Sequence, residues 1–551
     1  MTVRLVGLGG LGEFGANSLL LDDDAAGRVV VDVGAAFADE PALGLSYEVP
    51  DFAAVTGPTP GLLVLSHAHD DHSKGLALAL DAWPGCRVAG SRTTLAWCRG
   101  AMTGMRAHAS ELGAGPALSS AGWQVEGLPV SHSIPGTLAL RLRSPAISLV
   151  VASDLRVAAS ALGEETSLDE LAHWGADGVD VLLLDSTNAL VATPPPSEST
   201  VAATLAELVR GTRGMAVAVS FASHLGRFRQ VAMAAASAGR VVVPVGRGLV
   251  EALAVQARLG GIGLPLGLVR PARELGRLPR DGVVAVVTGS QGEPGSAFTR
   301  LATGHLAGLT LQAGDRLLHA ARVIPGNERR LASLFDLCVR QGAEVVTAGE
   351  APIHASGHPH RQELETLLDV LRPRWVLPVH GWRRHLEAVA GLARRHGASA
   401  VAAETGDELA WVGGALEPSG RRLAVGRLAF GDGDDKRLDT GLIHTRRALA
   451  RFGAMVAVVV ENGARRPVVQ LHPAGLRLSR EELDELTAAV QGEAGRLLAA
   501  GTVDADDASL TMERWLRREL RRRCGQRPAV VVSVVRGSGQ ADRPGADGPP
   551  A

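Results

Sequence analysis

Ser66-His67-Ala68-His69-Asp70-Asp71-His72 places three histidines and two aspartates within seven residues. The apolar run Gly61-Leu62-Leu63-Val64-Leu65 precedes it and is typical of a buried strand, so the cluster is expected in the loop that leaves this strand. Imidazole and carboxylate groups together are ligands for zinc, manganese or iron. His67 and His69 can point one way while Asp71 and His72 turn toward a second position, so one segment can supply two metal sites, as two-metal hydrolysis requires.

Four later segments each carry a potential ligand directly after an apolar run. A single histidine or aspartate at the end of a strand is more often a structural residue than a ligand. Here the four follow the histidine cluster in series, which favours a common site formed at strand ends. These residues are His132, Asp154, Asp185 and His380.

A glycine-rich segment near the start has the spacing of a dinucleotide-binding motif. Gly7-Leu8-Gly9-Gly10-Leu11-Gly12 follows an apolar run, and Asp32 lies twenty residues beyond Gly12. A helix would have to begin within such a motif, but Asn17-Ser18-Leu19-Leu20-Leu21 is typical of a strand. We therefore interpret the glycines as a tight turn between strands close to the metal-binding loop.

The length and the sequence pattern indicate several domains. A chain of 551 residues exceeds the about 250–300 residues that one hydrophobic core serves. Residues 197–347 alternate helical patterns with apolar strands, which predicts a doubly wound α/β domain with a parallel sheet. After a Gly/Asp-rich stretch at 430–435, a small α/β unit follows, in which Ser479-Arg480-Glu481-Glu482 is a capping box that begins a helix.

Composition narrows the class of protein. The net charge is −2, so the chain as a whole has no basic signal for nucleic acid. The apolar runs are strand-sized, far shorter than a membrane span, and the first residues do not resemble a signal peptide. Four scattered cysteines are expected to be reduced thiols. These features predict a cytoplasmic protein with no membrane partner.

Several further motifs are distinctive. They are Leu184-Asp185-Ser186-Thr187-Asn188-Ala189, Phe221-Ala222-Ser223, Thr288-Gly289-Ser290-Gln291-Gly292-Glu293-Pro294, Ile324-Pro325-Gly326-Asn327-Glu328, His354-Ala355-Ser356-Gly357-His358 and Pro378-Val379-His380-Gly381. With the histidine cluster, they make the chain similar to the metallo-β-lactamase superfamily and, within it, to the β-CASP nucleases of the ribonuclease J family. The resemblance covers nearly the whole chain. One departure is Trp382, which follows the last motif where the family often has Glu.

The resemblance implies an α/β fold: a metallo-β-lactamase αββα sandwich with an inserted β-CASP α/β domain and a small C-terminal α/β domain. The sandwich would be formed from two parts of the chain. The expected segments are 1–195 for its first part, 196–350 for the β-CASP domain, 351–428 for its second part, 429–452 for a linker, 453–536 for the C-terminal domain and 537–551 for a disordered tail.

The resemblance also implies a ligand set for two divalent metal ions, Zn²⁺ or Mn²⁺. His67, His69 and His132 would hold one ion. Asp71, His72 and His380 would hold the second, and Asp154 would bridge the two. All seven positions keep a residue type that can bind metal.

Further roles follow residue by residue from the same resemblance. Asp71, Asp185 and His358 are the expected catalytic residues. Asp185 would orient a metal-binding histidine, and His358 would contact the scissile phosphate and protonate the leaving oxygen. The expected substrate-binding residues, which include a pocket for a 5′-phosphorylated end, are Phe221, Ser223, His354, Ser356, Gly357 and His358.

The implied activity is a two-metal ribonuclease in RNA maturation and decay, a 5′→3′ exonuclease that prefers 5′-monophosphate ends and also cuts internally. The implied partners are single-stranded RNA, further copies of the chain in a homodimer or homotetramer, and an RNA-degradation complex. Arginines are the expected cations of an RNA groove, because the chain has only two lysines. The candidates are Arg227, Arg229, Arg247 and Arg322.

Other functions remain open at this point. One is a β-CASP nuclease that acts on DNA, and another is a small-molecule hydrolase with the same fold. A third is a weakly active or non-catalytic RNA-binding subunit of a nuclease complex. The β-CASP and pocket motifs favour a polynucleotide over a small molecule, and the intact ligand set favours an enzyme.

Overall fold

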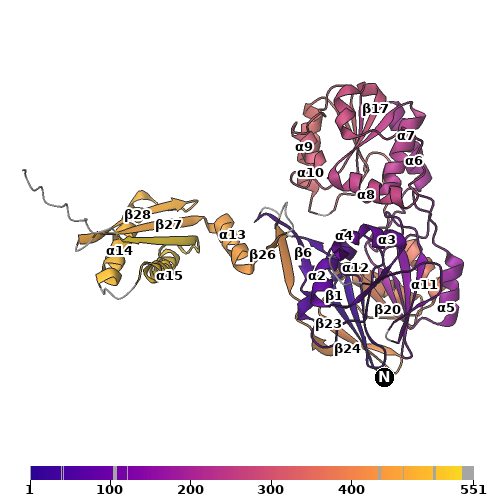
Figure 1. The fold of residues 1–551 in the computed structure, drawn as a ribbon, viewed down its shortest axis with the longest axis horizontal. Helices are drawn as coiled ribbons and strands as arrows, with labels where there is room; N and C mark the ends of the chain where they lie inside the picture. The colour runs from indigo at the N-terminus through magenta and orange to yellow at the C-terminus, as the bar shows by residue number, and fades with distance from the viewer. Residues whose placement is uncertain are drawn as a thin grey trace, which may run out of the picture. The chain divides into compact units, whose positions relative to one another are not determined.

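The computed structural model describes residues 2–38, 40, 43–103, 108–120, 122–324, 326–431, 436–462, 465–499 and 504–536. The predicted tail at 537–551 lies outside these residues. Contacts divide the chain into two compact units (Figure 1). The first comprises Met1–Phe37 and Glu48–Leu428, and the second comprises Ala38–Tyr47 and Ala429–Ala551. None of the helices in the described ranges combines the length and hydropathy that a membrane span needs.

The first unit contains two large sheets. The eight-stranded sheet has the order β24-β23-β1-β3-β4-β7-β8-β9. Its strands are β1 (Val3–Gly9), β3 (Ser18–Asp23), β4 (Gly27–Val31), β7 (Leu62–Val64), β8 (Arg87–Gly90), β9 (Ala109–Glu111), β23 (Asp407–Val412) and β24 (Ala415–Arg422). The seven-stranded sheet has the order β10-β11-β12-β13-β14-β20-β22. Its strands are β10 (Leu118–Ser120), β11 (Trp123–Pro129), β12 (Leu138–Arg143), β13 (Ser148–Ala152), β14 (Val181–Asp185), β20 (Trp375–Val379) and β22 (Ser399–Ala400).

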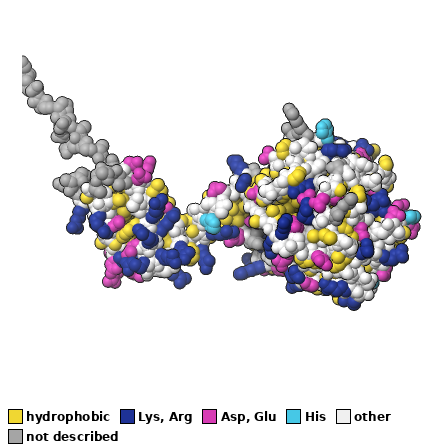
Figure 2. All heavy atoms as spheres, turned by 90° about the horizontal axis from the view of Figure 1, so that it is seen from below, with side chains coloured by type: hydrophobic (Ala, Val, Ile, Leu, Met, Phe, Trp, Pro, Cys, Tyr) yellow, Lys and Arg dark blue, Asp and Glu magenta, His cyan; other side chains and the backbone are white. Residues whose placement is uncertain are grey.

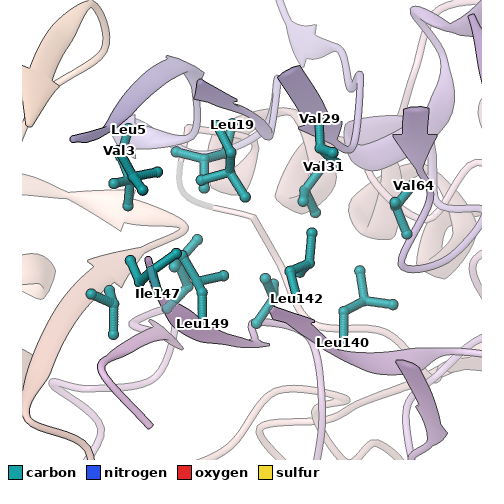
Figure 3. Close-up of a cluster of buried hydrophobic side chains, with 14 of the residues drawn as sticks. Val3, Leu5, Leu19, Val29, Val31, Val64, Leu140, Leu142, Ile147 and Leu149 are labelled. Carbon is teal, nitrogen blue, oxygen red and sulfur yellow. The ribbon is translucent and has the colours of Figure 1, made fainter. Parts of the chain in front are cut away.

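The main core lies between these two sheets. Figure 3 shows Val3, Leu19 and Val29 facing Leu142 and Leu149 across the gap, all of them buried. The outer face of the seven-stranded sheet is covered by α5 (Leu168–Asp177), α11 (Arg361–Leu371) and α12 (Arg383–Arg395). Four short helices belong to the first part of the chain, and α3 contacts β8 and β9. They are α1 (Asp70–Ser73), α2 (Leu76–Ala82), α3 (Arg92–Trp97) and α4 (Arg99–Met102). The architecture is the expected αββα sandwich.

An α/β domain is inserted between β14 and β20. Its five parallel strands have the order β16-β17-β15-β18-β19, and helices pack on both faces, as the alternating pattern predicts. In Figure 1, α6, α7 and α8 lie on one side of β17, and α9 and α10 lie on the other. The strands are β15 (Ala216–Val219), β16 (Val241–Val245), β17 (Val283–Val287), β18 (Arg316–His319) and β19 (Glu344–Thr347). The helices are α6 (Glu198–Arg210), α7 (Leu225–Ser237), α8 (Arg247–Arg258), α9 (Ala297–Ala302) and α10 (Glu328–Arg340).

Strand register brings distant segments to one edge of the sandwich. In the seven-stranded sheet β14 is parallel to both β13 and β20, with Leu184 paired to Ala152 and to Pro378. The carboxyl ends of the three strands therefore lie side by side. Asp185 is the last residue of β14, and Asp154 and His380 follow the ends of β13 and β20. In the other sheet β4 and β7 are parallel, with Val31 paired to Val64, so Asp32 lies next to the start of the histidine loop.

The second unit contains a three-stranded sheet of order β28-β27-β29, with Met455 and Val459 buried against α14 and α15. The predicted capping box is confirmed, because Ser479 N donates to Glu482 Oε2 at 2.7 Å and Glu482 N donates to Ser479 Oγ at 3.1 Å. The segment predicted as a linker contains regular structure, including β26 (Arg437–Leu438) and the helix α13 (Thr440–Phe452). The other elements are β27 (Ala454–Asn462), β28 (Arg465–Ala474), α14 (Arg480–Ala499), α15 (Ala505–Cys524) and β29 (Ala529–Arg536).

Candidate metal centre

Three histidines form the first group of candidate ligands. His67 Nε2 lies 3.0 Å from His69 Nδ1, which lies 3.2 Å from His132 Nε2. Asp154 Oδ2 is 3.8 Å from both His67 Nε2 and His132 Nε2. His67 and His132 are buried, as is Asp154. Four ligand atoms from three separate parts of the chain thus surround one point.

Asp71, His72 and His380 form the second group. His380 Nε2 lies 3.0 Å from Asp71 Oδ2, and His72 Nε2 lies 3.8 Å from the same oxygen. Asp154 joins the two groups, because its Oδ1 is 3.2 Å from His72 Nε2 while its Oδ2 faces the first group. The structure therefore brings together all seven residues that the sequence indicated as metal ligands.

The donor set fits divalent metal ions. Tetrahedral coordination with metal–nitrogen bonds of about 2.0–2.1 Å places two ligand nitrogens about 3.3 Å apart, close to the spacing in the first group. Asp154 Oδ1 is buried and has no hydrogen-bond partner among the described residues. A cation between His72 and Asp154 would satisfy this oxygen, which is otherwise costly to bury.

Four of the five candidate histidines, His67, His72, His132 and His380, use the second ring nitrogen to contact the protein. His67 Nδ1 lies 3.0 Å from Ser66 Oγ, and His132 Nδ1–H donates to the Gly357 carbonyl at 2.8 Å. His380 Nδ1 lies 2.6 Å from Thr187 Oγ1. Such contacts hold the ring orientation and leave the other nitrogen free to bind metal.

Gly357 is required for one of these contacts. A Cβ atom at this position would lie 2.9 Å from the ring atoms of His132, closer than a carbon atom can approach. Only a residue without a side chain lets the main chain come near enough for its carbonyl to accept from His132 Nδ1. The Gly357 backbone therefore positions a candidate ligand of the first group.

Two residues at the site were missed by the sequence reasoning. Asp32 Oδ2 is 2.7 Å from His72 Nδ1, and the same carboxylate accepts from Ser66 N and Ser66 Oγ, both at 2.7 Å. Asn17 Nδ2 is 2.9 Å from His72 Nε2. Both residues belong to the segment that mimicked a dinucleotide motif. The strand expected there is confirmed as β3. The signal that could have identified Asp32 is its position directly after β4, the strand that pairs with β7.

Electrostatics differ between the two groups. Burial lowers the pKa of His69 to about 4, and burial with neighbouring histidines lowers the pKa of His67 and His132 well below the usual range. In the second group, burial is the largest single effect and acts against the charged form, but Asp154, Asp71 and Asp185 together outweigh it and raise the pKa of His380 to about 9. The carboxylates around His72 raise its pKa in the same way. The first group is therefore neutral at pH 7, and the second holds protons that a metal ion must displace.

Asp185 is paired with His358. Its Oδ2 accepts from His358 Nδ1 at 2.7 Å, and Asp154 Oδ2 is 3.6 Å from the same nitrogen. Burial opposes protonation, but these two carboxylates together raise the pKa of His358. This differs from the expectation that Asp185 orients a metal-binding histidine, because Thr187, two residues further on, reaches His380 Nδ1 instead.

The expected pocket residues lie on two loops. Ser356 Oγ accepts from Asn188 Nδ2 at 3.0 Å, and the same Nδ2 donates to the His358 carbonyl at 3.1 Å. Burial, with Arg227 and Arg322 nearby, lowers the pKa of His354 to about 3, and its Nδ1 has no partner among the described residues. Phe221 and Ser223 lie, partly buried, in the loop between β15 and α7.

His224 was also missed. It caps α7 by accepting from Arg227 N on Nδ1 at 3.2 Å, so its proton is on Nε2. That Nε2 is buried without a partner among the described residues. His354, His132 and His69 are close enough to act on the pKa of His224, which burial lowers. A buried donor therefore lies beside the first group of ligands.

The four candidate arginines differ in exposure. Arg227 is fully buried and pairs with Glu198 at 3.0 Å, so the prediction that it lines an RNA groove is wrong: its guanidinium holds α7 to α6. Arg229 is partly buried, and the Arg247 side chain is 91 % exposed. Arg322 is exposed and donates to Asn188 Oδ1. On the face in Figure 2, basic and acidic side chains are interspersed, in keeping with the small net charge.

Comparison with protein families assigns most of the first unit. Residues 11–150 match the metallo-β-lactamase superfamily, and residues 213–337 match the β-CASP domain of ribonuclease J. Residues 345–403 match the Zn-dependent metallo-hydrolase RNA specificity domain. A protein named ribonuclease J from Mycolicibacterium smegmatis is 32 % identical over 97 % of both chains. The chain belongs to the ribonuclease J family.

Other relatives agree with this assignment. A ribonuclease J from Sinorhizobium meliloti is 32 % identical over 96 % of both chains. Among solved structures, a protein of unknown function from Enterococcus faecalis V583 aligns with a TM-score of 0.55 and 16 % identity, covering 75 % of this chain and all of that one. The second likeness supports the fold alone.

Proposed function

We propose that this member of the ribonuclease J family is a two-metal ribonuclease that removes nucleotides from 5′-monophosphate RNA ends and also cuts RNA internally. The observation that carries the proposal is the convergence of the two ligand groups on Asp154, whose two oxygens face one group each. A ribonuclease J family chain with this site is a hydrolytic ribonuclease. Its end preference and its mode of cutting are the proposed part.

The seven residues around Asp154 are the proposed ligands of two divalent ions, Zn²⁺ or Mn²⁺. His67, His69 and His132 would hold one, and Asp71, His72 and His380 the other. Such a pair of ions supplies an activated water and neutralises charge on the phosphate oxygens.

His358 is the proposed contact to the scissile phosphate. Burial is the largest single effect on its pKa, but Asp185 and Asp154 together outweigh it, raise the pKa and so favour the protonated ring. Asp185 holds its Nδ1–H, so in that form Nε2–H is left to donate to a phosphate oxygen or to the leaving oxygen. Its side chain is 21 % exposed, in agreement with a group that meets substrate.

The loop from His354 to His358 and the loop from Phe221 to His224 are the proposed pocket for the 5′-phosphate. The support is a set of buried polar atoms that lack partners among the described residues, His354 Nδ1 and His224 Nε2. A phosphate accepts from a buried donor such as His224 Nε2–H, and Arg322 adds positive charge nearby. A neutral histidine has a single ring N–H, which in His224 is on Nε2, so we expect His224 to donate to the phosphate without a charge of its own.

The test uses one RNA sequence with a 5′-monophosphate, a 5′-triphosphate or a 5′-hydroxyl, with Mn²⁺ or Zn²⁺ supplied. Rapid release of mononucleotides from the monophosphate alone is expected, and internal cuts are expected in all three. His69→Ala and Asp154→Ala are expected to abolish both. Ser356→Ala is expected to reduce end-directed cutting more than internal cutting.

Other outcomes would contradict the proposal. Tight RNA binding without cleavage would favour a non-catalytic subunit of a nuclease complex, and faster cleavage of DNA would favour a DNA nuclease. Equal loss of both activities in Ser356→Ala would exclude Ser356 from a 5′ pocket. Assembly into a homodimer or homotetramer, membership of an RNA-degradation complex and a cytoplasmic location stay predictions.

A further inference from the structure

Trp382 is a large apolar side chain left exposed beside the metal centre. It ends the short strand β21 (Gly381–Trp382), which pairs with β2 (Leu11–Gly12) and directly follows His380. The residue is 40 % exposed. A Cβ atom at Gly381 would lie 2.6 Å from Ser186 Oγ, so the main chain next to Trp382 is tightly packed.

Aromatic contacts join Trp382 to the centre. Phe14 meets the indole edge-on with ring centroids 5.1 Å apart, and it meets the His380 ring at 5.8 Å. His385 supports both, at 5.2 Å from Phe14 and 5.8 Å from Trp382. A single phenyl ring thus separates the exposed indole from a candidate metal ligand, on the His380 side of the centre.

The charge around Trp382 is positive. The Arg384 guanidinium lies over the indole, 5.2 Å from its centroid, and Arg384 makes no ion pair within the described part of the chain. Its neighbour Arg383 pairs with Glu387 at 2.7 Å, so its charge is balanced. Arg384 and Arg322 are also both near enough to His385 to lower its pKa, after the larger effect of burial. An aromatic face flanked by unbalanced arginine is the arrangement that binds single-stranded nucleic acid.

We propose that Trp382 and Arg384 form a stacking platform for a base of the RNA on the 3′ side of the scissile phosphate. The inference rests on the proposed function and extends it. The side follows from placement: the proposed 5′ pocket lies beside His132, and Trp382 lies beyond His380. RNA that crosses the centre from the pocket would reach the indole with one of its first two downstream nucleotides.

The test compares the wild type with Trp382→Ala, Trp382→Phe, Arg384→Met and the matched control Arg383→Met. Substrates are 5′-monophosphate RNAs, either complete or with one abasic nucleotide at each position in turn. Both kcat and KM are measured with Mn²⁺, and equilibrium binding of the same RNAs is measured in a chelator, where no cleavage occurs.

Loss of one partly exposed stacking face is expected to weaken binding and raise KM about five- to tenfold in Trp382→Ala, with kcat nearly unchanged. The RNA affinity of Trp382→Phe is expected to stay within about twofold of the wild type, and that of Arg384→Met is expected to fall about two- to fivefold. Arg383→Met is expected to match the wild type. An abasic nucleotide at one downstream position is expected to weaken RNA binding by the wild type as much as Trp382→Ala weakens binding of the complete RNA. Trp382→Ala is expected to bind the complete RNA and this abasic RNA with the same affinity.

Three results would overturn the platform. The first is an RNA affinity and a KM of Trp382→Ala that lie within twofold of the wild type. The second is a loss of RNA affinity of the same size at every abasic position. The third is a fall in kcat in Trp382→Ala that Trp382→Phe does not restore. Binding that depends on Trp382 at one position, without any cleavage by the wild type, would instead keep the platform and refute the proposed hydrolysis.

Discussion

At the scale of single residues, the centre is organised by contacts of the second ring nitrogen in most of its histidines. Ser66, Thr187 and the Gly357 carbonyl each occupy one nitrogen and direct the other inward. Asp32 and His380 also have backbone φ angles of 60° and 59°, a left-handed region that is strained for residues other than glycine. The protein holds these conformations by packing around the site, which keeps the ligand atoms in place before any metal binds.

Asp32→Asn tests the role of the carboxylate that the sequence reasoning missed. The amide can keep the contact to Ser66, but it cannot stabilise a basic His72 ring, so a fall of about 10–100-fold in metal affinity or activity is expected. Metal titration and steady-state rates measure it. Asp51→Asn, at the partly exposed cap of a short helix, is the matched control. Rates equal to the control would show that Asp32 is not needed at the site.

The pKa shifts predict that the two ions bind with different proton release. Asp154 and Asp71, against the effect of burial, raise the pKa of His380 to about 9, so below pH 9 a proton competes with the ion in the second group. Because the pKa of His72 is raised as well, metal affinity there is expected to rise by at least about tenfold per pH unit between pH 7 and pH 9. The first group is already neutral, and its affinity is expected to change little in this window. Calorimetry in buffers of different ionisation enthalpy checks this, and equal proton release at both sites would contradict it.

At the scale of secondary-structure elements, strand formation and helix capping follow from local sequence, whereas burial does not. The strand pattern at 17–21 and the capping box at 479–482 were readable because neighbouring residues determine them. The linker prediction overlooked α13, because a Gly/Asp-rich start does not exclude a helix that begins a few residues later. The environment of Arg227 depends on α6 packing against α7, which no local pattern reveals.

Arg227→Met tests the interpretation that this arginine joins two helices. The change leaves Glu198 and Gln230 without their buried partner, so a loss of about 3–5 kcal/mol in the free energy of unfolding is expected. Arg229→Met on the same helix is the control, with little change expected, because Arg229 makes no ion pair within the described residues. Urea denaturation followed by circular dichroism measures both. Equal stability of the two variants would refute the structural role of Arg227.

At the scale of the whole molecule, the metal centre lies at strand ends, outside the hydrophobic cores. The sandwich core between the two sheets and the two cores of the inserted domain are built from apolar side chains, which pack without a metal ion. The fold of the first unit therefore does not depend on metal for its main stabilisation, unlike a small zinc domain.

Removal of divalent ions is expected to abolish RNA cleavage and to leave the fold unchanged. The far-ultraviolet circular dichroism is expected to stay unchanged, with a fall of a few degrees in the unfolding midpoint because a bound ion stabilises only the folded state. Re-addition of Mn²⁺ or Zn²⁺ restores activity in this view. A collapse of the spectrum in chelator would show instead that the metal is structural.

The sequence by itself determined the family resemblance, which implied the seven candidate ligands and the αββα sandwich with its insert. That resemblance depends on short motifs and on their order, which the chain carries directly. Tertiary structure alone decided that Asp32 meets His72, that Asn188 meets Ser356, and that Phe14 lies between His380 and Trp382. The physical reason is strand register and packing: contacts between residues tens or hundreds of positions apart form only when parallel strands align their carboxyl ends, and no local pattern specifies that alignment.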